Sequence, residues 1–172
     1  MREIEVDSIL GDTNLVLDNA HLIFFNPSIK DVVEVCDWIL SRVPEIVLDD
    51  LIYEYVLNHD RIDCRWMYGI VSGAELSGER LRFIYESVLY KDTIINDSYR
   101  LKTLGVVLDK YEIDKDDDNT YVLVDMLWNE IKEYSIEYEG IGELLRIARK
   151  RTGGFLDKRI EESGLILGEY DK

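Results

Sequence analysis

The sequence predicts an α/β fold: a helix-rich, three-layer α/β/α arrangement with a mostly parallel central sheet. Short apolar runs alternate with amphipathic helical patterns, which is typical of parallel strands joined by helices. Only two prolines and eleven glycines interrupt the 172 residues, which favours helices with short connections over a sandwich of many strands. A chain of this length can bury one sizeable core, so we expect a single domain over residues 1–172.

The predicted strands are short. Residues 15–18 form an apolar run that ends on Asp18, and residues 45–48 form a second run that ends just before Asp49 and Asp50. Weaker patterns predict an edge strand over residues 3–10, a brief strand or apolar padding over 93–95, and a final strand over 165–167.

Helices are predicted from apolar residues at helical spacing and from capping signals. Ser28 and Asp31 are interpreted as a capping box that begins a helix, which Pro44 ends. The next helix begins at Asp49 or Asp50. The later helices are expected at residues 77–89, 97–111, 120–132, 142–151 and 155–163. Residues 59–75 are expected to be irregular, and residues 112–119 are expected to form an exposed acidic loop.

The chain is strongly acidic, with a formal charge of −16. Such a surface repels nucleic acids and anionic membranes at long range and suits basic partners, divalent cations or simple solubility. The cysteines, Cys36 and Cys64, form no zinc pattern with the two histidines. The chain shows no signal peptide and no apolar run that could cross a bilayer, so we expect a cytoplasmic protein without a membrane partner.

Carboxylates follow both predicted strands. In open parallel sheets, ligands bind beyond the carboxyl ends of the strands, where Asp18 and Asp49 would lie. Glu54 lies one turn along the next helix, on the same face as Asp50. If the strands are neighbours, these oxygens converge and suit Mg²⁺ or Mn²⁺. The alternative is that each acid only caps a helix or loop, or is solvated.

This order of elements resembles the first half of PIN-domain ribonucleases of the VapC type. The resemblance rests on residues 15–18, the capped helix, residues 45–48 and the helix that carries Glu54. It implies an α/β/α sandwich that cleaves RNA phosphodiesters with Mg²⁺ or Mn²⁺. On this resemblance Asp18, Glu54 and either Asp117 or Asp118 would hold the ion, with Asp18, Glu54 and Asp118 as catalytic acids.

Further acids are candidates for the remaining acidic positions of the family. Glu143 is an alternative third acid, and Asp157 is the nearest candidate for the fourth. The basic residues of the chain concentrate late in the sequence, where they could guide RNA or neutralise neighbouring acids. The predicted substrate-binding residues are Arg146, Arg149, Lys150 and Arg151.

A second hypothesis needs no catalysis. The charge of −16 equally suits a non-catalytic acidic interaction protein, which would bind a basic protein partner or imitate nucleic acid. In the acidic loop, Asp114, Asp116 and Asp118 have calcium-loop spacing, but the sixth position is Asn119 where such loops need glycine. The loop is therefore expected to be solvated. A homodimer is left open.

Overall fold

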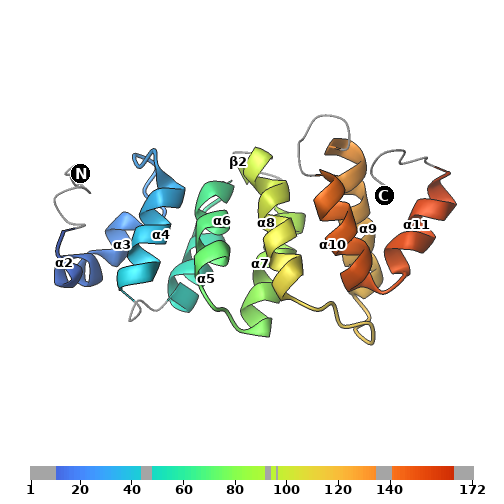
Figure 1. Cartoon of the computed structure of the whole chain (residues 1–172), viewed down its shortest axis with the longest axis horizontal. Helices are drawn as coiled ribbons and strands as arrows, with labels where there is room; N and C mark the ends of the chain where they lie inside the picture. Colours follow the sequence, from blue (N-terminus) through green and yellow to red (C-terminus); the bar gives the residue numbers. More distant parts are fainter. Residues whose placement is uncertain (1–10, 44–47, 92–93, 96, 135–140, 165–172) are drawn as a thin grey trace. The chain divides into compact units, whose positions relative to one another are not determined.

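The structure is a computed structural model that describes residues 11–43, 48–91, 94–95, 97–134 and 141–164 (Figure 1). Its contacts group into two compact units. Unit 1 comprises residues 1–76 and 93–96, and unit 2 comprises residues 77–92 and 97–172. The expected single domain over residues 1–172 stays a prediction.

Unit 1 contains short helices and two very short strands. Its elements are α2 (Thr13–Asp18), α3 (Ala20–Ile23), α4 (Val32–Arg42), α5 (Leu48–Asn58), β1 (Ile62–Asp63), α6 (Cys64–Gly73) and β2 (Ile94–Ile95). In the described residues of unit 2, the regular elements are all helices, and residues 111–119 form a loop between two of them. Its elements are α7 (Gly78–Tyr90), α8 (Asp97–Lys110), α9 (Thr120–Tyr134), α10 (Ile141–Thr152) and α11 (Phe155–Ser163).

The predicted three-layer α/β/α fold is wrong. Strand pairing within the described residues is limited to β1 and β2, which run parallel with Ile62 opposite Ile94 and Asp63 opposite Ile95. Two residues per strand cannot form the central layer of a sandwich. Of the two alternatives left open for residues 93–95, a brief strand or apolar padding, the structure has the strand at 94–95. The strands expected at 3–10 and 165–167 lie outside the described residues, as do residues 45–47 of the strand expected at 45–48, and Leu48 begins helix α5.

The strand predicted at residues 15–18 is helix α2. The Asp12 carboxylate accepts the backbone N–H groups of Asn14 at 2.9 Å and Leu15 at 3.3 Å, which caps the helix. Only Val16 is buried among the α2 residues. A run of three apolar residues fits either a helix or a strand, and here the cap selects the helix.

Two other expectations in unit 1 are corrected. The helix expected from Ser28 begins at Val32, and Asp31 precedes it without a capping side-chain hydrogen bond. Ser28 instead donates its backbone N–H to the Asn26 side chain at 2.9 Å, in a turn. The expected irregular stretch 59–75 contains α6, which the Asp63 carboxylate caps by accepting the Arg65 N–H at 3.0 Å.

Helices α4 and α6 pack closely, side by side (Figure 1). Two glycines, Gly69 and Gly73, stand one turn apart on α6. A Cβ at Gly69 would lie 2.8 Å from the Cβ and 2.9 Å from the Sγ of Cys36, and a Cβ at Gly73 would lie 2.9 Å from Leu40 Cδ1. The missing side chains therefore let the two helices approach more closely than alanine would allow.

An aromatic cluster surrounds the start of α6. Phe25 stacks on Tyr55 with ring centroids 3.8 Å apart, and both Phe24 and Phe25 contact Trp66. The Tyr55 hydroxyl accepts the backbone N–H of Asp63 at 2.8 Å. Phe25 has a φ of 64°, a strained value for a residue with a side chain, and its ring contacts hold it there.

Unit 2 is a packed set of helices in which α10 contacts α8, α9 and α11. Ser77 caps α7, and Gly164 ends α11 in the left-handed conformation that glycine favours. The core includes the fully buried side chains Tyr85, Leu104, Leu108 and Leu127. The helices predicted from residue 77 onward are confirmed, with ends that differ by at most two residues.

Candidate functional site

The predicted metal ligands are not gathered into a cluster. Asp18 is the exposed last residue of α2, and Glu54 is exposed on α5, both in unit 1. Asp117 and Asp118 belong to unit 2. Among the described residues, no group of three or more His, Cys, Asp or Glu side chains is arranged to hold a metal ion. The prediction required Asp18 to follow the end of a strand, but Asp18 belongs to helix α2.

The Asp117 carboxylate already binds two groups of the same chain. Its carboxylate accepts the Asn119 backbone N–H at 2.8 Å and lies 2.5 Å from the guanidinium of Arg82. The hydrogen bond from Asn119 and then the Arg82 guanidinium hold the pKa of the Asp117 carboxyl below its ordinary value. Asp118 is exposed beside it. Asp117 therefore fastens the acidic loop to α7.

The predicted substrate-binding residues all lie on α10, and their arginines contact carboxylates of the same chain. Arg146 pairs with Glu143 at 2.6 Å, within one turn of the helix, and this hydrogen-bonded pair lowers the pKa of Glu143. Arg149 pairs with Asp157 of α11 at 2.6 Å. Glu143, the alternative third acid, and Asp157, the candidate fourth acid, are therefore both paired with arginines.

Arg151 is held in the same way. It lies 3.0 Å from the Glu112 carboxylate and also donates to the backbone carbonyl of Asp109 at the end of α8. Lys150 is exposed. A guanidinium that already binds a carboxylate must break that bond before it can bind a phosphate, which weakens the case for an RNA-guiding surface.

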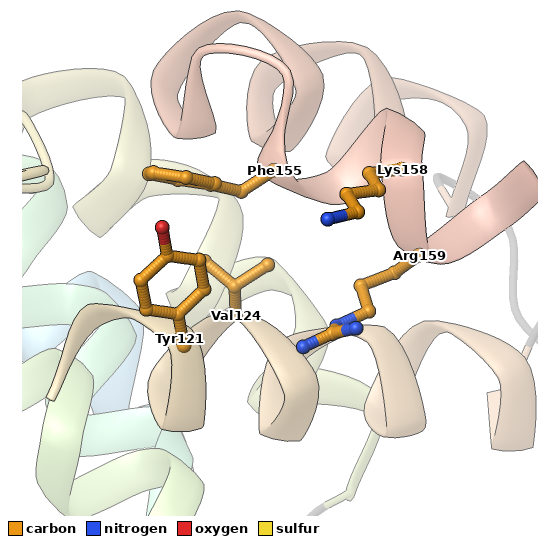
Figure 2. A pocket seen from close by; sticks show the side chains of 5 residues that line it. All are labelled: Tyr121, Val124, Phe155, Lys158 and Arg159. Carbon is orange, nitrogen blue, oxygen red and sulfur yellow. The ribbon is translucent and has the colours of Figure 1, made fainter. Parts of the chain in front are cut away.

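A small hollow lies between α9 and α11 (Figure 2). The rings of Tyr121 and Phe155 meet edge to face with centroids 4.7 Å apart. Lys158 and Arg159 extend from α11 toward α9, and Arg159 contacts the carboxylates of Asp125 and Glu162. The volume of about 20 Å³ holds about one water molecule. The hollow is therefore a gap between packed helices and is far too small for a nucleotide.

The outer face of α5 is the most distinctive surface of unit 1. Its other side packs into the core through Leu48, Ile52, Tyr55 and Val56. The outer face comprises Asp50, Tyr53, Glu54 and Leu57. These positions follow the i, i+3, i+4, i+7 spacing and therefore form one stripe along the helix.

Two large apolar side chains on this stripe are open to solvent. Tyr53 is 48% exposed and Leu57 is 58% exposed, and each has a carboxylate beside it, from Asp50 and Glu54. Sequence reasoning missed this pair as a surface feature because it followed only the buried stripe. The available signal was that Tyr53 and Leu57, four residues apart, do not belong to that stripe.

Comparison with family models, curated proteins and solved structures finds no match to this chain. None of the helices in the described ranges is long and apolar enough to span a membrane. The cytoplasmic location and the resemblance to PIN-domain ribonucleases stay predictions, although the fold that the resemblance implies is wrong.

Proposed function

We propose that this chain is a non-catalytic helical interaction protein whose acidic surface binds a basic segment of another protein. The proposal is based on the ion pairs that the arginines form with carboxylates of the same chain. The chain has 36 acidic side chains and 20 Lys and Arg, and many described arginines already contact carboxylates of the same chain. The charge left for a partner is therefore negative.

The ion pairs of unit 2 connect different elements. Arg82 joins α7 to the acidic loop, Arg149 joins α10 to α11, and Arg159 joins α11 to α9. Each pair is close to neutral when seen from a distance, so it adds little to the field around the protein. The surplus acids create that field, which attracts basic partners and speeds their association.

The surplus is uneven along the chain. Unit 1 has 15 acidic residues (Asp and Glu) and 5 basic residues (Lys and Arg), a formal charge of −10. Unit 2 has 21 acidic and 15 basic residues, a formal charge of −6. Unit 1 is also the shorter of the two. A basic partner is therefore attracted most strongly to unit 1, and nucleic acid is repelled most strongly there.

Binding of a basic partner can be measured with defined probes. We would titrate the full chain with a lysine-rich peptide of about 20 residues, at low and at physiological salt, and follow fluorescence anisotropy. We expect the peptide to bind at low salt and its affinity to fall as salt rises. A fluorescent single-stranded RNA of the same length serves as the oppositely charged control and should not bind.

Two outcomes would overturn the proposal. One is the failure of the peptide to bind at low salt. The other is Mn²⁺-dependent cleavage of the RNA that is lost in an Asp18→Asn, Glu54→Gln variant, since this would restore the nuclease hypothesis. Cleavage that persists in that variant would come from a contaminating nuclease, and the peptide measurement would then decide.

A further inference from the structure

We infer that the outer face of α5 is the docking site for an amphipathic basic helix, whose apolar side chains cover Tyr53 and Leu57 while its lysines or arginines meet Asp50 and Glu54. This inference rests on the proposed function and deepens it by naming the surface and the kind of segment it binds. Three features of the face point to this occupant.

The first feature is the apolar pair. Tyr53 and Leu57 stand four residues apart on α5, so their side chains are neighbours on one face. The opposite face of the same helix is buried in the core of unit 1. Helix α5 thus buries one side and presents Tyr53 and Leu57 on the other, which is the arrangement that a partner helix uses as anchor points.

The second feature is charge. Asp50 and Glu54 lie one turn apart, and α5 contains no lysine or arginine. Among the described residues, no cation lies within ion-pair distance of either carboxylate. Two like charges at this spacing weaken an isolated helix slightly. Cations of a partner relieve this repulsion, so the face selects a basic segment.

The third feature argues against a second copy of this chain. A symmetric dimer through α5 brings the same stripe of both copies together, because a two-fold interface uses one patch twice. Asp50 and Glu54 of one copy then face the same acids of the other. Repulsion of four carboxylates around one apolar contact opposes that dimer, whereas a basic helix replaces the repulsion with attraction.

The test uses two peptides of about 18 residues, or about five helical turns. One carries leucine and lysine at helical spacing, and the other carries the same lysines with serine in place of leucine. We expect the leucine–lysine peptide to bind the full chain more tightly. Leu57→Ser should weaken that complex about tenfold, as expected for the loss of one buried leucine contact, and should barely change binding of the serine peptide.

Matched variants separate this face from the rest of unit 1. Leu22→Ser removes an exposed leucine from α3, and Glu34→Lys makes the same charge change on α4 as Glu54→Lys makes on α5. Leu57→Ser and Glu54→Lys should weaken binding of the leucine–lysine peptide more than these controls do. Circular dichroism of each variant reports whether its helices are intact.

The results distinguish failure of the docking site from failure of the proposed function. Equal effects of the α5 variants and their controls would overturn the docking site and leave the proposed function standing, because binding would then follow overall charge. Failure of both peptides to bind the parent chain would overturn both. A dimer in sedimentation that Leu57→Ser dissociates would also overturn the docking site, since α5 would then be covered by a second copy.

Discussion

Units 1 and 2 use their charged residues differently. In unit 2, Arg82, Arg100, Arg149 and Arg159 connect separate elements by ion pairs, and the formal charge is −6. In unit 1, Arg65 pairs with Asp63 only two residues away, and the formal charge is −10. Unit 1 relies instead on close helix packing and stacked rings. Several acids of unit 2 therefore hold its own helices and acidic loop together, whereas Asp50 and Glu54 of unit 1 lie exposed on α5.

The largest effect should come from the ion pair between Arg100 of α8 and Glu130 of α9. The pair is 2.5 Å long, and its side chains are only 10% and 14% exposed. Arg100→Ala leaves the Glu130 carboxylate buried without this guanidinium, so we expect a loss of about 3 kcal/mol in the free energy of unfolding. Urea denaturation measures the loss.

The control for Arg100 is Arg146→Ala. Arg146 also pairs with a carboxylate, but its side chain is 58% exposed, so its removal should lower the free energy of unfolding far less than removal of Arg100 does. Equal losses for the two variants would show that the buried pair of unit 2 contributes no more than a solvated pair, which would contradict the contrast between the units.

The second effect tests close packing in unit 1. Gly69→Ala forces a Cβ against Cys36, and the overpacking should outweigh the higher helix propensity of alanine, with a net loss of about 2 kcal/mol. Gly105 lies within α8 and has open space around it, so Gly105→Ala should stabilise by about 0.5–1 kcal/mol. If both substitutions stabilise the chain, the close contact between α4 and α6 is wrong.

The third effect provides a separate readout for unit 1, because both cysteines belong to it. Cys36 and Cys64 are buried, and burial raises the pKa of the Cys36 thiol to about 12. The native thiol is therefore protonated and shielded at pH 8. Iodoacetamide should label neither cysteine until unit 1 opens, and Gly69→Ala should speed the labelling while Arg146→Ala leaves it unchanged.

The smallest effect concerns the titration of the Asp117 carboxyl at low pH. The pKa of Asp117 is lowered in the folded chain, so its contribution to stability is complete above the unfolded value of 3.8 and is lost as the pH falls through the lower folded value. Arg82→Met removes the guanidinium and should move the titration of Asp117, followed by NMR, back toward 3.8. An unchanged titration would mean that the Asn119 N–H alone sets this pKa.

The helices of unit 2 could be predicted because their signals are local. Ser77 caps α7, the glycines at 153 and 154 separate α10 from α11, and Gly164 ends α11. The errors arose in unit 1, where the apolar runs are too short to distinguish a helix from a strand. At Leu15, Val16 and Leu17 the capping side chain of Asp12 decided for the helix.

The candidate site was less predictable than the helices. Glu54 was correctly expected on a helix that also carries Asp50, but convergence with Asp18 required strand ends that α2 does not provide. The partners of the arginines could not be predicted either. Arg151 meets Glu112 thirty-nine residues away, and such a contact depends on how helices pack and not on spacing in the chain.

The amino-acid sequence by itself determined the excess of acid, the positions of most helices and the presence of glycines that stop them, because composition, capping and periodicity act over a few residues. Tertiary structure decided which carboxylates form ion pairs with arginines and which lie exposed to solvent. It buried Arg100 against Glu130 and left Tyr53 and Leu57 exposed on α5, since burial depends on which faces of distant helices meet.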